Sequence, residues 1–289
     1  MNAESRHTLA GNAALTALYL DKAYVPLPNS TLNEKLSIAT NQTITNNDRH
    51  ALKAYVVGNR GHHFITGPDA IPISVLYEYD PGDACIYGLI PLVIRPIAED
   101  LDVAQRANYC LRRIETISGV TYVAYYGRRV NTEAMVINHQ MIDLRDSGAG
   151  TIPYQYRLQN LQPEHVPFLR PEDRVQRINS KVLRASSVMS LSMTTWESNE
   201  FRNACRIKYG SEDYAVISEI GQVMGVDRTV TGQGPGGASN VTYNEIIGAV
   251  VSSMTSVYYY MGQQNSRFLY TSDVGISEPM IRLKDEQDD

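Results

Sequence analysis

From Leu36 to Val130 the sequence is a series of short runs rich in β-branched and aromatic residues, and glycine or proline separates most of them. The runs are Leu36 with Ile38, Ala54–Val57, Ile73–Tyr77, Cys85–Ile94 and Val120–Tyr126. Such residues suit the pleated, half-buried surface of a strand, and Gly and Pro mark turns. Because strands and helices do not alternate along the chain, we predict a β-dominated α+β or β-sandwich-like fold with antiparallel sheets, and no doubly wound nucleotide-binding sheet.

The last third of the chain continues this pattern with longer strands. Apolar and polar residues alternate from Leu183 to Met193, as in a strand with one buried face. We expect further strands at Tyr214–Met224 and at Ile246–Met261, the latter as one long strand or a bent pair. The uncharged stretch Ile246–Ser266 is long enough to cross a bilayer, but its many Ser, Thr, Gln and Asn side chains favour a strand outside the membrane.

Two short helices are predicted within this β-rich chain. Between Asp100 and Thr116 the apolar residues have helical spacing, and acidic and basic residues stand at the ends that suit the helix dipole. In the second helix, Thr194–Tyr209, Glu197 follows Thr194 by three residues and so forms a capping box. The thin apolar face of Thr8–Leu20 predicts a short helix or an arm that orders only against a neighbour.

A polar, glycine-containing turn, Arg145–Gly150, suggests a division into two β-rich regions with one helix each, 1–150 and 151–289. A single discontinuous fold is the alternative. Four prolines between Pro153 and Pro171 predict an extended segment that drapes over a neighbouring surface.

Composition excludes several classes of protein. Hydrophobic residues make up 43% of the 289 positions and charged residues 20%, which is enough for an ordered core. The formal net charge of −5 gives no positive field for nucleic acid, which we do not expect as a partner. The three cysteines form no C-x-x-C pair, and the N-terminus shows no secretion signal, so we expect reduced thiols and synthesis in a cytoplasm.

No enzyme, metal or cofactor motif stands out. The loop Gly232–Gly237 lacks the Gly-Lys-Ser/Thr ending of a phosphate-binding loop. His62 and His63 would point to opposite faces of a strand and so could not readily share one ion. We therefore predict a protein that is not an enzyme and has no cofactor, although a pair of distant glycosidase carboxylates stays open.

Tyrosines and arginines supply the candidate contact surfaces. The chain has 19 tyrosines against four phenylalanines and one tryptophan, and tyrosine is enriched at partly wet protein interfaces. A helix through 170–184 would carry a stripe of basic residues. In order of preference, this stripe would be a solvated face, a protein-contact surface or a nucleic-acid-binding surface. The candidate interface residues are Tyr125, Tyr126, Arg170, Arg174, Arg177, Tyr258, Tyr259 and Tyr260. For the tyrosines, packing within the chain is the alternative.

The C-terminal order is a strand (Leu183–Met193), a capped helix (Thr194–Tyr209), a strand (Tyr214–Met224), a glycine-rich loop and a Tyr-rich strand. Together with the segment Ile44–Gly58, this order resembles structural proteins of tailed-bacteriophage virions, most of all the baseplate-wedge proteins of contractile-tailed phages.

The resemblance implies a homo-oligomeric virion component, made in the host cytoplasm, that binds other virion structural proteins in the tail or baseplate. We expect neither membrane nor nucleic acid as a partner, for the reasons of composition and charge given above. A head–tail connector, neck or capsid-associated protein is the alternative. A carbohydrate-binding or host-surface-binding module is the second, because aromatic β-surfaces also stack on sugars.

Overall fold

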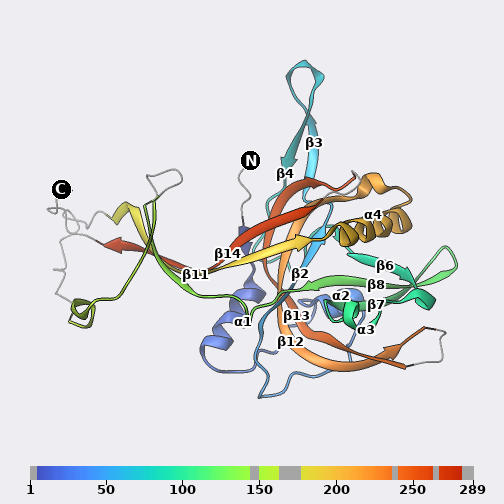
Figure 1. Ribbon diagram of the computed structural model, residues 1–289, viewed down its shortest axis with the longest axis horizontal. Coiled ribbons are helices and arrows are strands. Elements are labelled where there is room, and N and C mark those ends of the chain that lie inside the picture. The colour runs from blue at the N-terminus through green and yellow to red at the C-terminus, as the bar shows by residue number, and fades with distance from the viewer. Residues whose placement is uncertain (1–4, 144–149, 163–176, 236–239, 263–266, 282–289) are drawn as a thin grey trace. The chain divides into compact units, whose positions relative to one another are not determined.

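The computed structural model describes residues 5–143, 150–162, 177–235, 240–262 and 267–281 (Figure 1). The chain divides into two units, of which the first comprises Met1–Thr132 and Leu191–Leu269 and the second Glu133–Ser190 and Tyr270–Asp289. Antiparallel strands dominate both units, which confirms the predicted fold class. Gly150 lies inside the second unit, and the division at that residue stays a prediction.

An eight-stranded antiparallel sheet forms the first unit. Along its path the strands are β1 (Ser5–His7), β13 (Asn240–Tyr260), β12 (Val216–Gln233), β2 (Ala51–Gly58), β8 (Val120–Arg129) and β6 (Val93–Pro96), with β5 (Leu89–Ile90) paired to β2 and β7 (Tyr109–Ile117) paired to β8. The hairpin of β12 and β13 runs from the pair Val216/Tyr260 to the pair Gln233/Asn240. The uncharged stretch is therefore strand over most of its length, and no helix of the described residues is long and apolar enough to cross a membrane.

Four α-helices accompany the sheet in the described residues: α1 (Leu9–Tyr19), α2 (Leu32–Leu36), α3 (Val103–Arg106) and α4 (Thr195–Tyr209). The expected capping box of α4 is present, because the Thr194 hydroxyl accepts from the Glu197 N–H while the Glu197 carboxylate accepts from the Thr194 N–H. Helix α1 matches the helical alternative for Thr8–Leu20. The strand expected at Leu36 and Ile38 is wrong, because a capping box of Thr31 and Glu34 begins α2 there.

The helix predicted at Asp100–Thr116 is also wrong over most of its length. Only α3 is helical, and Tyr109–Ile117 is strand β7, hydrogen-bonded along β8. The first four residues of β7 are all buried, so apolar residues occupy both faces and no alternation shows. Their spacing then imitates a helix.

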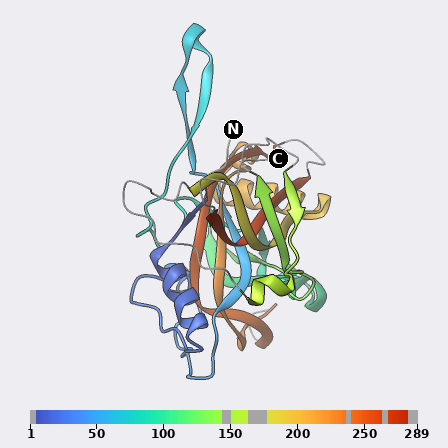
Figure 2. The same cartoon turned by 90° about the vertical axis from the view of Figure 1, so that its left-hand side faces the viewer.

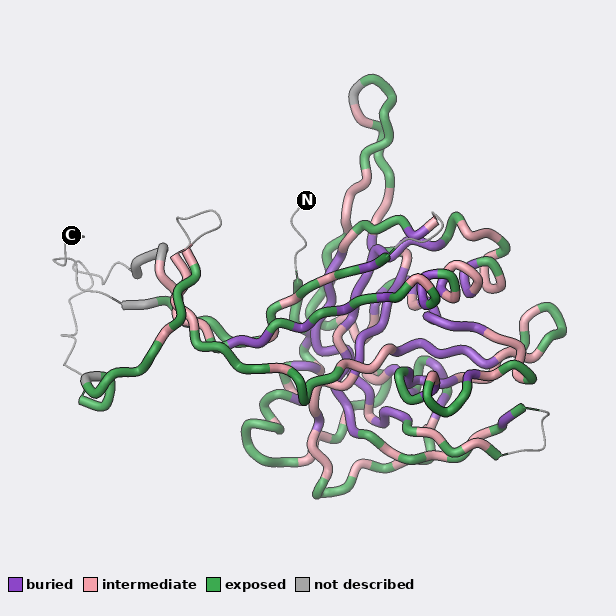
Figure 3. Tube along the Cα trace, in the orientation of Figure 1, coloured by how far each residue is buried: buried purple, intermediate pink, exposed green. Residues whose placement is uncertain are grey.

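The core of the first unit lies between its sheet and helices α2 and α4. Buried residues concentrate along the central strands (Figure 3). One continuous cluster joins Leu32 of α2, Val56 of β2, Tyr126 of β8, Ala204 of α4 and Val251 of β13. Since these residues are distant in sequence, the core fixes the positions of the loops at the sheet's edge.

A two-stranded hairpin of the first unit, β3 (His62–Thr66) and β4 (Pro72–Leu76), extends away from the eight-stranded sheet in both views (Figures 1 and 2). We call this hairpin with its connecting turn, residues 62–76, the arm. Its outer part is exposed (Figure 3).

The second unit is built on a four-stranded antiparallel sheet with the order β10 (Thr151–Pro153), β9 (Asn138–Asp143), β11 (Arg177–Met193) and β14 (Phe268–Ile281). Residues Leu158–Leu161 form a short 3-10 helix. Of the expected extended segment Pro153–Pro171, residues 163–171 lie outside the described part of the chain.

Candidate functional site

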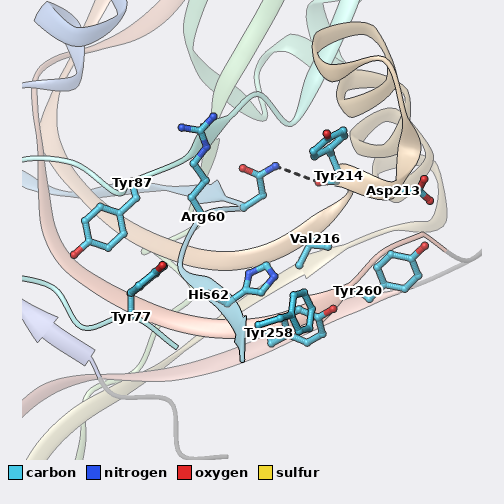
Figure 4. Close-up of a pocket in the computed structure, with 11 residues that line it drawn as sticks. Arg60, His62, Tyr77, Tyr87, Asp213, Tyr214, Val216, Tyr258 and Tyr260 are labelled. Atoms are coloured by element: carbon cyan, nitrogen blue, oxygen red, sulfur yellow. Dashed lines mark hydrogen bonds between the residues drawn. The ribbon is translucent and has the colours of Figure 1, made fainter. Parts of the chain in front are cut away.

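A pocket of about 820 Å³ lies in the first unit where the base of the arm meets the ends of β12 and β13 (Figure 4). Its lining is dominated by aromatic rings and is completed by a few polar groups. The lining residues are Asn59, Arg60, His62, Phe64, Tyr77, Tyr87, Asp213, Tyr214, Val216, Tyr258 and Tyr260. We call it the aromatic pocket.

Strand periodicity places two of these tyrosines. On β13, Tyr258 and Tyr260 lie two residues apart and point to one face, and both line the pocket. Tyr259, between them, does not line the pocket; its ring packs edge-to-face on Phe268 and its hydroxyl donates to the Arg267 carbonyl. The face expected from the sequence is therefore the face that the pocket uses.

Ring-to-ring contacts hold the pocket wall. The His62 ring packs edge-on against Tyr258, with centroids 4.7 Å apart, and against Phe64, at 5.3 Å. His63 stacks on Tyr77, another residue of the lining, with ring centroids 4.6 Å apart. The two adjacent histidines thus contact different rings, as expected for neighbours on a strand.

A buried carboxylate positions the loops behind the pocket. Glu219 of β12 is fully buried, and its Oε1 accepts from the Tyr79 hydroxyl and the Tyr87 N–H, both at 2.6 Å. Its Oε2 accepts from the N–H groups of Arg60, at 2.9 Å, and Gly88, at 2.8 Å. Four hydrogen bonds to one charged group fix two loops in place before any ligand arrives.

The ring of Tyr87 is held from a second direction. It stacks on Tyr79 with centroids 4.7 Å apart and planes 15° apart, and the Tyr87 hydroxyl donates to the Glu78 carbonyl at 2.7 Å. Since Tyr79 is itself bonded to Glu219, this ring is anchored to the same buried carboxylate.

Polar atoms without a partner stand within this aromatic lining. The Asn59 side chain donates to the Tyr214 carbonyl at 3.3 Å, and its buried Oδ1 has no hydrogen-bond partner. The buried Nδ1 of His62 has none either. Burial lowers the pKa of His62, although the nearby Glu219 opposes that shift, so its ring is neutral at neutral pH. One cation, Arg60, and one anion, Asp213, leave the lining without net charge.

This arrangement is suited to binding. Among the described residues, no three His, Cys, Asp or Glu side chains come together as a metal site requires. Aromatic faces and the polar side chains of Asn59, Arg60 and Asp213 provide stacking surface and hydrogen bonds, which orient a ligand in a small-molecule site.

The other predicted tyrosines lie in the interior. Tyr125 and Tyr126 are each 1% exposed, so they present no surface to a partner from the folded chain. The Tyr125 hydroxyl donates to buried Asp100, at 2.7 Å, and burial is the main reason that its pKa rises to about 12. Tyr125 and Tyr126 therefore match the alternative given for the tyrosines, which is packing within the chain.

The predicted arginines give no site in the described structure. Arg170 and Arg174 lie outside the described residues, and only the backbone of Arg177 is described, within β11. The helix that would have aligned a basic stripe is absent from 177–184, which is strand, and Arg184 forms an ion pair with Asp273 at 2.7 Å.

Most pocket residues carried no signal in the sequence. Asn59, Arg60, Tyr77 and Tyr87 lie in loops or at strand ends, and Tyr214 ends a 3-10 helix. An excess of tyrosine near predicted strand ends was the available indication, but only the fold brings these positions together.

The chain belongs to the family described as "Family of unknown function (DUF7208)", whose model matches residues 1–288. No curated protein and no solved structure matches the chain.

Proposed function

We propose that this chain is a structural assembly protein of a tailed-phage virion, and that it acts in the tail or baseplate through protein–protein contacts. The observation that carries the proposal is the arm. It extends from the sheet of the first unit and exposes large apolar side chains along both of its strands and its turn. These are Phe64, Ile65, Ile71 and Ile73, with exposed fractions of 56, 45, 59 and 42%.

An apolar hairpin of two strands has little stability of its own in water. Two strands alone are at best marginally stable in water, and β3 and β4 pair only with each other. Covering the exposed parts of four such side chains contributes about 1 kcal/mol each, or about 4 kcal/mol in total. A partner surface that receives the arm therefore supplies the stabilisation that the hairpin lacks, and the arm holds the partner in return.

The order of elements supports the virion assignment. Strand β11, the capped helix α4, strand β12, a glycine-rich connection and the Tyr-rich strand β13 follow one another as in the segment that resembles baseplate-wedge proteins. The family match neither names nor limits the function.

The arm is tested by making its outer surface polar. We expect the double variant Ile65→Asp/Ile71→Asp to keep the wild-type circular dichroism and to lose association with its partners, measured by sedimentation velocity of the chain alone and with purified tail proteins. Val103→Asp is the matched control, because Val103 is 80% exposed at the start of α3 and is far from the arm in sequence. Unchanged association of the double variant would refute the role of the arm.

The location is tested on particles of the phage that encodes this chain, separated into heads and tails and analysed by mass spectrometry. Recovery with tails at a fixed copy number is the expected result. Recovery with heads would favour the connector, neck or capsid reading over the baseplate, and complete absence from particles would overturn the virion proposal.

A further inference from the structure

The aromatic pocket lies at the base of the arm, and of its lining residues only Phe64 belongs to the apolar surface assigned to assembly. We propose that it binds an uncharged saccharide. The inference does not depend on the virion assignment, because it uses the pocket's rings, its polar lining and its charge.

The rings form faces that a sugar can cover. Tyr77, Tyr87, Tyr214, Tyr258 and Tyr260 line the pocket and keep exposed fractions between 39 and 51%. A pyranose presents C–H groups on its flat faces and hydroxyls around its edge, so it places apolar surface on such rings while its hydroxyls stay wet. The tyrosine hydroxyls add donors and acceptors at the edge of the same surface.

The pocket also carries polar side chains that suit a hydroxyl-bearing ligand. Asn59, Arg60 and Asp213 line it beside the rings, and His62 lies in the wall against Tyr258. Sugar hydroxyls both donate and accept, so they can pair with an amide, a guanidinium or a carboxylate group. An aliphatic side chain of a protein partner would offer these groups no hydrogen bond.

The charge and the volume of the aromatic pocket limit the class of ligand that it can bind. Arg60 and Asp213 balance each other in the lining, so the pocket offers no excess charge to a phosphate or to an acidic sugar. The volume of about 820 Å³ is that of a small-molecule site rather than of a flat protein interface. A neutral oligosaccharide fits both observations.

The site is also pre-organised. Glu219 holds the backbone of Arg60 and Tyr87 by direct hydrogen bonds, and the Ser218 hydroxyl accepts from the Gly61 N–H at 2.9 Å. A ligand therefore binds without first ordering these loops, which lowers the entropic cost of binding.

The experiment uses the full chain on an array of uncharged oligosaccharides of hexoses and N-acetylhexosamines, followed by calorimetric titration of the saccharide that the array selects. We expect Tyr258→Ala to raise the Kd about tenfold or more, since one stacking ring is lost, and Tyr258→Phe to keep the Kd near the wild-type value. Raising the salt concentration should leave the Kd unchanged.

The neighbouring residue supplies the control. Tyr259 is 37% exposed against 39% for Tyr258, but it lies on the other face of β13, so Tyr259→Ala should bind the saccharide as the wild type does. Absence of binding on the array would overturn the proposal, as would equal losses in the two alanine variants. Self-association that Tyr258→Ala abolishes and Tyr259→Ala does not, without sugar binding, would assign the pocket to a second copy of the chain instead.

Discussion

Replacing Glu219 with glutamine tests whether one buried carboxylate holds the loops of the aromatic pocket. The variant keeps the shape of the side chain but converts one accepting oxygen into an NH2 donor. Each carboxylate oxygen accepts two hydrogen bonds, so the amide nitrogen must face either Tyr79 and Tyr87 or Arg60 and Gly88. The first placement costs less, because the Tyr79 hydroxyl can turn and accept, which leaves only the Tyr87 N–H without an acceptor.

The magnitude follows from this count. A hydrogen bond to a charged group contributes about 1.5–3 kcal/mol, and the retained bonds weaken when the charge is removed. We therefore expect Glu219→Gln to lower the free energy of unfolding by about 2–3 kcal/mol. Tyr79→Phe, which removes one bond of the four, should cost about 1–2 kcal/mol, and Glu219→Ala, which removes all of them, at least about 4 kcal/mol.

Urea unfolding followed by the fluorescence of Trp196 is the assay. This residue is the chain's single tryptophan and lies on α4 of the first unit, so its emission reports the unit that contains Glu219. Tyr79→Phe should also leave saccharide affinity less affected than Glu219→Gln does, because it frees no backbone N–H. A Glu219→Gln variant within about 0.5 kcal/mol of the wild type would refute the reasoning, since that is the range of an ordinary surface substitution.

Three further outcomes follow from the structure. Burial raises the pKa of Glu245 from 4.5 to about 6, so the folded state binds this proton more tightly than the unfolded state, and the resulting stability is full below pH 4.5 and lost as the pH rises through about 6. The free energy of unfolding should therefore fall by about 2 kcal/mol between pH 4.5 and neutral pH. Glu245→Gln should remove this pH dependence. If the variant keeps the same dependence, the Glu245 carboxyl is not its source. Thr194→Ala should cost about 1 kcal/mol in urea unfolding, with Thr194→Ser restoring most of it, because the residue caps α4; equal stability of both variants would argue against the cap. A thiol reagent should leave Cys110 and Cys205 unmodified until urea unfolds the chain, because both are buried and burial raises the pKa of both thiols; rapid native labelling at either position, located by peptide mass spectrometry, would contradict the packing.

The predicted contact tyrosines fall into two groups, one at the surface and one in the interior. Tyr258 and Tyr260 could be assigned to one face because a strand has a period of two, and no distant residue changes that. Tyr125 and Tyr126 follow the same composition rule, yet each is 1% exposed, because other parts of the chain cover β8 on both faces. A tyrosine-rich run predicts an amphipathic surface, and whether that surface is free depends on what packs against it.

Local chemistry determined those features that a few neighbouring residues can decide. The alternation in Leu183–Met193 specifies a strand, and Thr194 with Glu197 specifies where α4 begins, because the groups that interact are at most four residues apart. The tertiary structure decided the rest. The strand at Tyr109–Ile117 follows from its partner β8 and from burial on both faces, against a spacing that suits a helix. Glu219 became the anchor of a pocket because folding brought the loops at Arg60 and Tyr87 to its side chain, 159 and 132 residues away in sequence. Contacts across such separations depend on the packing of the whole unit, and no local pattern encodes them.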